Sequence, residues 1–342
     1  MKQWLARWTT WEYWPWWFAN IPVYGFWLWY ALRSRHLFFF SNVNPLIPIG
    51  GVAGESKYDI LKSIPAAVLP RMVFFPAGAA PEAAPALLLE AGISYPLILK
   101  PDVGERGFLV QKIENEAQLL QSLRTHSIDL IAQEFLTHPA EMSVLFHRRP
   151  DTDTVVITSV CIKDFLKVCG DGHSSVRQLM GAQVRAGFQL ERFEKEKPEL
   201  MAYCPAAGET LLLEPIGNHA RGTKFLNGNH LIDEQLTAAF APICKAIEGV
   251  YYGRFDLKCA SPEALARGEF KVMELNGVLG EPAHVYDPAY GMWRAYRDYW
   301  RHWRILFEIS RIQRRRGVQN WTHRAAFRFI GNYFAYKKRL ES

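Results

Sequence analysis

Cysteine is scarce in this sequence: the 342 residues include five, at positions 161, 169, 204, 244 and 259. No pair has the C-x-x-C spacing and the number is odd, which argues against both a disulfide framework and a zinc site. Few, loosely spaced cysteines fit a reducing cytosolic environment. The stretch GGVAGESKY lacks the G-x-x-x-x-G-K-[ST] order of a P-loop, and we find no Ser/His/Asp or Cys/His set and no internal repeat.

A simple membrane-spanning run is also missing. Residues 13–32 carry no charge and are long enough to cross a bilayer, but Pro15, Asn20, Pro22 and Gly25 interrupt them. Eight of the 12 tryptophans lie in the first 30 residues, and tryptophan prefers the headgroup boundary. No small-residue cleavage site follows, so this is not a secretory signal. We interpret residues 1–40 as a Trp-rich membrane-interface segment. Packing against the rest of the protein, or a span or re-entrant hairpin, are the alternatives.

Most of the chain carries little net charge. Residues 289–342 carry a net charge of +10, whereas the whole chain carries +6. Within this tail, aromatic residues recur every three or four positions from Trp293 to Phe307 with arginines between them. This pattern predicts a basic amphipathic helix over residues 291–317 that lies on an anionic membrane surface. The alternative is a helix whose aromatic stripe docks on its own domain. Nucleic acid is not expected, because no recognition motif accompanies the basic residues.

The middle of the chain alternates strand-like and helix-like segments. YPLILKP, EMSVLFHRR, TDTVVITSVCI, YYGRFDLKCA and GEFKVMELNG predict strands, and ENEAQLLQSLRTH and DEQLTAAFAPICKAIEG predict helices. The mixed order with hairpins predicts an α+β fold. We expect the aromatic segment to be followed by a short N-terminal region and linker (41–90), a nucleotide-binding subdomain (91–145), a metal and substrate subdomain (146–288) and the basic helical tail (289–342).

Three oxygen-bearing side chains are predicted to converge on two neighbouring strands. Glu274 and Asn276 are two residues apart on one strand, so they point the same way. Asp256 lies on the preceding strand, and a hairpin would bring it beside them. Hard oxygen ligands of this kind suit Mg²⁺, which completes its shell with water and phosphates. The sequence therefore predicts a magnesium site that presents a triphosphate.

A phosphate-binding loop is predicted in LKPDVGERGFLV. Lys100 closes an apolar strand, and Gly104 and Gly107 allow a tight turn whose backbone N–H groups can bind anionic oxygens. Further along, IAQEFL offers a hinge for a nucleobase, and Glu141 a carboxylate for a ribose.

The order of these motifs resembles the ATP-grasp superfamily. YPLILKPDVGERG, QEFL with Glu141, GRFDLK and MELNG are similar in order and spacing to the motifs of D-alanine–D-alanine ligase. VCGDGHSSVRQLM and GNHARGTKF resemble segments of cyanophycin synthetase and the α-L-glutamate ligases. The resemblance covers about residues 55–288 and implies an ATP-grasp fold, in which two α+β subdomains clasp ATP. The region before it is short for a full N-terminal substrate domain and begins with the Trp-rich segment.

The resemblance also implies roles for individual residues. Lys100, and either Lys57 or Lys62, would bind nucleotide phosphates beside Gly104 and Gly107. Glu134, Phe135 and Leu136 would meet adenine, and Glu141 the ribose. Asp256, Glu274 and Asn276 would ligate Mg²⁺ or Mn²⁺. Arg254, together with Arg221 and Asn218 of the GNHARG segment, would stabilise the transferring phosphoryl group. Asp171 and His173 would lie near the substrates. Structural alternatives remain for each, such as an ion pair for Glu141 or Arg221.

The implied reaction is ATP-dependent ligation of a carboxylate to an amine through an acyl phosphate. The aromatic, basic ends add the expectation of a peripheral protein on the cytoplasmic membrane face, acting on a lipid-linked or envelope-related substrate. A non-catalytic nucleotide-binding membrane adaptor and a kinase of the same fold are the alternatives. The oligomeric state stays open, a homodimer included.

Overall fold

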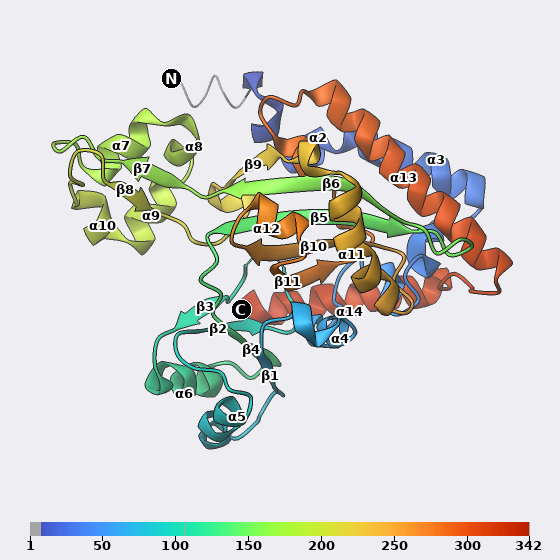
Figure 1. Cartoon of the computed structure of the whole chain (residues 1–342), viewed down its shortest axis with the longest axis horizontal. Coiled ribbons are helices and arrows are strands. Elements are labelled where there is room, and N and C mark those ends of the chain that lie inside the picture. Colours follow the sequence, from blue (N-terminus) through green and yellow to red (C-terminus); the bar gives the residue numbers. More distant parts are fainter. Residues whose placement is uncertain (1–7, 106, 342) are drawn as a thin grey trace.

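The computed structural model describes residues 8–105 and 107–341 (Figure 1). The first seven residues of the predicted aromatic segment lie outside this range. Within it, the strands form a five-stranded sheet, a four-stranded sheet and a two-stranded sheet. The α+β class predicted from the sequence is confirmed.

The largest sheet is antiparallel, with strand order β11-β10-β5-β6-β9. Its strands are β5 (Ala140–Arg148), β6 (Val155–Asp164), β9 (Lys224–Asn227), β10 (Tyr252–Cys259) and β11 (Phe270–Asn276). One face carries apolar side chains such as Met142, Val144 and Phe255, which pack against helix α11 (Glu234–Ala246) and the short α12 (Pro262–Ala266). The alternate residues face the other way and are largely polar, so the strand alternation separates an apolar face from a polar one.

The four-stranded sheet has the order β1-β4-β2-β3. It consists of β1 (Met72–Phe75), β2 (Leu97–Pro101), β3 (Gln111–Ile113) and β4 (Leu130–Glu134). Helices α5 (Ala84–Glu90) and α6 (Glu116–Thr125) cover its outer face and bury Leu88 and Leu119. The subdomain predicted over residues 91–145 corresponds to this sheet, which also includes β1 because β1 pairs with β4, whereas β5 joins the larger sheet.

A small lobe projects from the end of β6 (Figure 1). It pairs β7 (Lys167–Cys169) with β8 (Thr210–Leu212) and contains α7 (Val176–Ala182), α8 (Val184–Gly187), α9 (Leu190–Glu196) and α10 (Pro198–Ala202). Its own apolar cluster, including Val176, Met180 and Phe193, makes it a separate packing unit.

The two aromatic ends of the chain pack against each other. Helix α3 (Ile21–Ser34), which follows the short α2 (Trp16–Ala19), lies beside α13 (Met292–Arg315) (Figure 1). The Tyr30 ring lies 5.1 Å from Trp300 and 5.0 Å from Phe307, and Phe39 completes this cluster. The last helix, α14 (His323–Glu341), also contributes to it. The predicted helix over residues 291–317 therefore exists, and part of its aromatic stripe docks on its own protein.

Several large apolar side chains nevertheless stay on the outside of this helical layer. Helix α3 exposes Ile21, Leu28, Trp29 and Leu32, and α13 exposes Trp293. None of the helices described here is both long enough and apolar enough to cross a bilayer.

The α3–α13 contact predicts a stability effect. We expect Tyr30→Ala to lower the free energy of unfolding by about 3–5 kcal/mol, because it removes a buried ring from a packed aromatic cluster. Leu32→Ala, on the exposed side of the same helix, should change it by about 0.5 kcal/mol or less. Urea unfolding of both variants measures the difference, and equal unfolding midpoints would show that α3 is not part of the cooperative core.

Candidate active site

A continuous cavity of about 1300 Å³ lies between the four-stranded sheet and the polar face of the five-stranded sheet. Lys100 and Gln133 line it from the smaller sheet, and Asp256 and Glu274 from the larger one. Two subdomains that face one cleft form the arrangement implied by an ATP-grasp fold.

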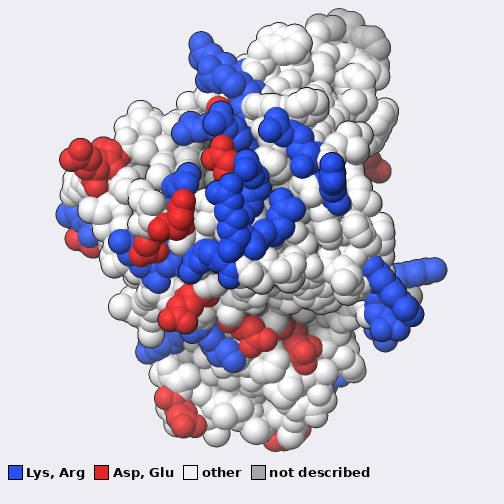
Figure 2. All heavy atoms as spheres, turned by 90° about the vertical axis from the view of Figure 1, so that its right-hand side faces the viewer, with Lys and Arg blue, Asp and Glu red and all other residues white. Residues whose placement is uncertain are grey.

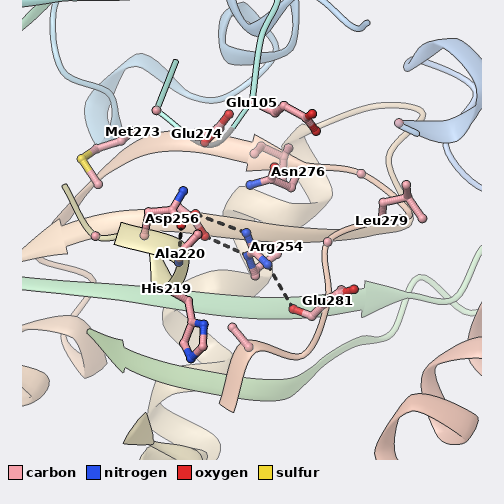
Figure 3. Close-up of a pocket in the computed structure, with 18 of the residues that line it drawn as sticks. Glu105, His219, Ala220, Arg254, Asp256, Met273, Glu274, Asn276, Leu279 and Glu281 are labelled. Atoms are coloured by element: carbon pink, nitrogen blue, oxygen red, sulfur yellow. Dashed lines mark hydrogen bonds and ion pairs between the residues drawn. The ribbon is translucent and has the colours of Figure 1, made fainter. Parts of the chain in front are cut away.

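The strand register brings the predicted metal ligands together. β10 and β11 are antiparallel neighbours in which Asp256 lies opposite Glu274, and Arg254 lies opposite Asn276. All four side chains line the cavity (Figure 3). The convergence expected from the alternation on each strand is therefore present.

Asp256 lies in a strongly cationic environment. Its carboxylate is 2.9 Å from Arg254 Nε and 3.4 Å from Lys163 Nζ. Burial alone would raise the pKa of Asp256, but the charges of Arg254 and Lys163 outweigh it and lower the pKa to about 2. Asp256 is thus ionised at neutral pH, as a metal ligand must be.

Glu274 and Asn276 are less fully engaged. The nearest cation to Glu274 is Lys57, at 3.8 Å, and the buried amide nitrogen of Asn276 has no hydrogen-bond partner among the described residues. No group of three or more His, Cys, Asp or Glu side chains in the described ranges is arranged to hold a metal ion. Two carboxylates and an amide make a small set of hard donors, which fits Mg²⁺ sharing its shell with phosphate and water better than a closed protein cage.

Lys100 bridges the two subdomains. Its Nζ donates to Gln133 Oε1 at 3.1 Å within its own sheet and to the Met273 carbonyl at 3.0 Å across the cleft. Burial lowers the pKa of Lys100 to about 8, with Glu274 opposing the shift. A buried cation beside an open cavity is well placed to bind an anionic ligand.

The structure separates the two candidate second lysines. Lys57, at the start of α4 (Lys57–Lys62), lines the cavity and donates to the Gly104 carbonyl. Lys62 is exposed, pairs with Asp59 at 3.1 Å and does not line the cavity. Gly104 and Gly107 both line it, and Gly107 has a φ of +74°, which favours glycine. The geometry therefore favours Lys57.

The predicted nucleoside contacts also reach the cavity. Glu134, Phe135 and Leu136 line it, although the Glu134 carboxylate is 2.9 Å from Arg71. Glu141 is buried and 2.8 Å from Lys163 Nζ, so the ion pair left open as its alternative is present.

Of four further predicted residues, one lines the cavity and three do not. Asn218 lines the cavity, while its side chain accepts from Ala220 N. Arg221 does not line it: its Nε donates to Glu214 at 2.9 Å. Asp171 and His173 lie on the small lobe, before α7, and line no part of the cavity. The lobe that carries them packs around its own core.

Sequence reasoning missed several residues that line the cavity. Lys163 lies directly opposite Glu141 in the sheet, and Glu281 follows β11 on the loop that crosses the cavity. Glu55 also lines it, with one carboxylate oxygen buried and without a partner in the described structure. Alternation along β6 could have placed Lys163 on the same face as Cys161, but only the strand order brings it beside Asp256.

A buried Ser–His–Asp chain was also not anticipated. Ser159 Oγ lies 2.7 Å from His284 Nδ1, and His284 Nε2 lies 3.1 Å from Asp298 Oδ2. None of the three lines the cavity, and Ser159 and His284 are each 1% exposed. These contacts link β6, the turn η8 (Ala283–Tyr286) and α13.

Close backbone packing holds the loop after β11. A Cβ at Gly277 would lie 2.4 Å from the Gly50 carbonyl oxygen, and one at Gly51 would lie 2.7 Å from Gly277 Cα. The backbone that leaves the metal-ligand strand therefore rests directly on the N-terminal loop.

Comparison with known proteins finds no matching family model and no curated protein of similar sequence. Among solved structures, the chain is similar to the VanG D-Ala:D-Ser ligase of Enterococcus faecalis, with 16% identity, a TM-score of 0.41, and coverage of 74% of this chain and 61% of that one. For a bifunctional glutathione synthetase of Pasteurella multocida the identity is 17%, the TM-score 0.42, and the coverage 73% and 35%. For a D-alanine–D-alanine ligase of Bacillus anthracis the identity is 12%, the TM-score 0.41, and the coverage 76% and 68%.

This chain therefore spans less than two thirds of the first two ligases. Each TM-score is below 0.5 and each identity is below 25%.

The lowered pKa of Lys100 predicts a pH dependence. Its positive charge is lost as the pH rises through about 8, so we expect the affinity for ATP to fall on the order of tenfold between pH 7 and pH 9. Calorimetric titration with MgATP measures the slope. Lys100→Met should bind weakly with no such slope, and an unchanged slope in this variant would assign the effect to another group.

Proposed function

We propose that this protein is an ATP-dependent ligase that joins a carboxylate to an amine through an acyl phosphate. The observation that carries the proposal is the convergence of Arg254, Asp256, Glu274 and Asn276 on one face of β10 and β11, in a cavity that Lys100 enters from the opposite sheet.

The proposed reaction has two steps. A carboxylate oxygen of the substrate attacks the γ-phosphorus of ATP, the bond from that phosphorus to the bridging oxygen breaks, and ADP leaves. The nitrogen of the amine then attacks the acyl carbon, inorganic phosphate leaves, and the nitrogen loses a proton. A bound Mg²⁺, held by Asp256, Glu274 and Asn276, would supply a Lewis acid for the phosphate oxygens.

Other residues of the cavity would supply positive charge to the phosphates and hold the nucleotide in position. Lys57 and Lys100 place positive charge near the predicted phosphates, and Phe135 and Leu136 offer apolar contact to a base. Arg254 uses three of its five N–H donors on Asp256 and the Glu281 carbonyl, which leaves others for a transferring phosphoryl group. Such preorganised charge is the main source of catalysis in phosphoryl transfer.

Membrane association is a second part of the proposal. The exposed apolar side chains of α3 include Leu32, which is 67% exposed, and Trp29, which is 49% exposed and has the Arg33 guanidinium 5.9 Å from its ring. Figure 2 shows Lys and Arg side chains gathered on the face that carries the C-terminal end of α13. Apolar side chains beside basic ones favour an anionic lipid surface. We propose that the protein binds the cytoplasmic face of a membrane peripherally and that one substrate is lipid-linked.

The ligase assignment predicts the effect of Glu274→Gln. We expect it to lower ADP release by about 100-fold or more, because a ligand of the predicted metal loses its charge. The assay supplies MgATP, a panel of carboxylates and hydroxylamine, which converts acyl phosphates to hydroxamates that mass spectrometry detects. Glu269→Gln, in the exposed turn before β11, is the matched control.

The other outcomes of this assay separate the alternatives. A phosphorylated product that hydroxylamine leaves intact would indicate a kinase. ATP binding without ADP release from any carboxylate would favour the adaptor and count against the ligase.

The membrane proposal predicts the effect of charge on α3. We expect the double variant Leu28→Glu, Leu32→Glu to reduce co-sedimentation with phosphatidylglycerol-containing vesicles by about tenfold or more, because each buried leucine contributes about 1.5–3 kcal/mol. Leu87→Glu with Leu89→Glu, on exposed positions of α5, is the control. Point changes are preferable to deletion of residues 1–40, which would remove the buried Tyr30 and Phe39. Vesicle binding by the α3 variant at the wild-type level would contradict the proposal.

A further inference from the structure

The cavity is larger than a nucleotide site requires. Ordinary ligand pockets occupy roughly 300–1000 Å³, whereas this one has about 1300 Å³ and continues past the metal-ligand strand. Beyond that point its walls come from α3 and α13, and each helix presents one face, with positions spaced by three and four residues. The lining residues of these faces are Val23, Tyr24, Trp27, Tyr299, His302, Trp303 and Leu306. We call this region the apolar end.

Glu281 lies where the polar and apolar ends meet. Its carboxylate accepts from the hydroxyl groups of Tyr286, at 2.7 Å, and Tyr299, at 3.3 Å, and both tyrosines line the cavity. Within the described parts of the chain, no Lys, Arg or His side chain forms an ion pair with this carboxylate. Burial, with the charge of Glu281, raises the pKa of both tyrosines, so they remain neutral donors.

Arg254 separates Glu281 from the nucleotide side. Figure 3 shows it bonded on one side to Asp256 and on the other to the Glu281 carbonyl oxygen, which is 3.3 Å from Nη1. The substrate that reaches the acyl carbon from the side away from ATP therefore passes Glu281. A carboxylate at Glu281 would be repelled, whereas an ammonium group would gain a partner.

We propose that the apolar end binds the amine substrate, and that this substrate is a primary amine with an apolar body. Its ammonium group pairs with the Glu281 carboxylate, which accepts one proton so that the neutral nitrogen can attack the acyl carbon, and its hydrocarbon portion lies between α3 and α13. The inference rests on the proposed function, since it assigns the acceptor of the acyl group. It also explains why the aromatic N-terminal segment is folded onto the catalytic subdomains: its inner face forms a wall of the acceptor site.

The test is calorimetric titration of the full chain with butylamine, hexylamine and octylamine, and with hexanol and hexanoate as matched probes. We expect affinity to rise about three- to fourfold with each added methylene until the apolar end is filled. Hexylamine should bind at least about tenfold more tightly than hexanoate. Glu281→Gln should abolish this preference and leave the binding of hexanol unchanged.

Two lysine substitutions on α3 provide a matched pair. Tyr24 and Leu28 are each 46% exposed and lie one turn apart, but only Tyr24 lines the cavity. Tyr24→Lys should weaken hexylamine and hexanol by about tenfold or more, while Leu28→Lys should match the wild type. Leu279→Lys, on an exposed loop residue of the cavity, repeats the test without touching a helix.

The outcomes keep this inference distinct from the ligase assignment. Tighter binding of hexanoate than of hexylamine, no dependence on chain length, or an unchanged preference in Glu281→Gln would overturn the amine site. If the same protein still releases ADP and forms hydroxamates in the assay described above, the ligase assignment stands without the amine site. If MgATP has no effect but hexylamine binds as expected, the ligase assignment fails and the apolar amine site remains.

Discussion

The opposition of Asp256 and Glu274 across two antiparallel strands is the constraint on which the site depends. Two carboxylates on one sheet face repel each other, and here Lys163, Arg254 and Lys57 offset that repulsion. The cations come from three different segments, β6, β10 and α4, so the charge balance exists only when the larger sheet is paired in this register and α4 is packed against it. The charge balance of the site therefore depends on correct folding of the sheet.

The wall of the cavity differs in chemical character from one part to the next. The part beside the glycine loop has Lys57 and Lys100 together with Glu55 and Glu105, the strands β10 and β11 contribute Asp256, Glu274 and Arg254, and α3 and α13 contribute aromatic side chains. Each region comes from a different part of the sequence: the four-stranded sheet, β10 with β11, and the terminal helices. A reaction that needs a polyanion, a metal and an apolar substrate in line can use these regions in that order.

Local patterns explain which features could be predicted from the sequence. Alternation on a strand sets the side-chain face, so Glu274 and Asn276 were placed correctly, and aromatic spacing located α13. Lys163 was missed because its position beside Asp256 depends on the strand order β10-β5-β6, which no local pattern encodes. Arg221 was expected in the cavity, but Glu214 holds its side chain elsewhere. Asp171 and His173 belong to a lobe whose separate core could not be recognised without its tertiary contacts.

The close backbone contact between residues 50–51 and 277 limits which positions around the cavity can change. Any side chain at Gly277 would wedge the backbone apart and move the strand that carries Glu274 and Asn276. The walls on α3 and α13 face no such limit, since they are built from side chains alone. Under the proposed function, substitutions on these two helices would alter the choice of acceptor without moving the strand that carries Glu274 and Asn276.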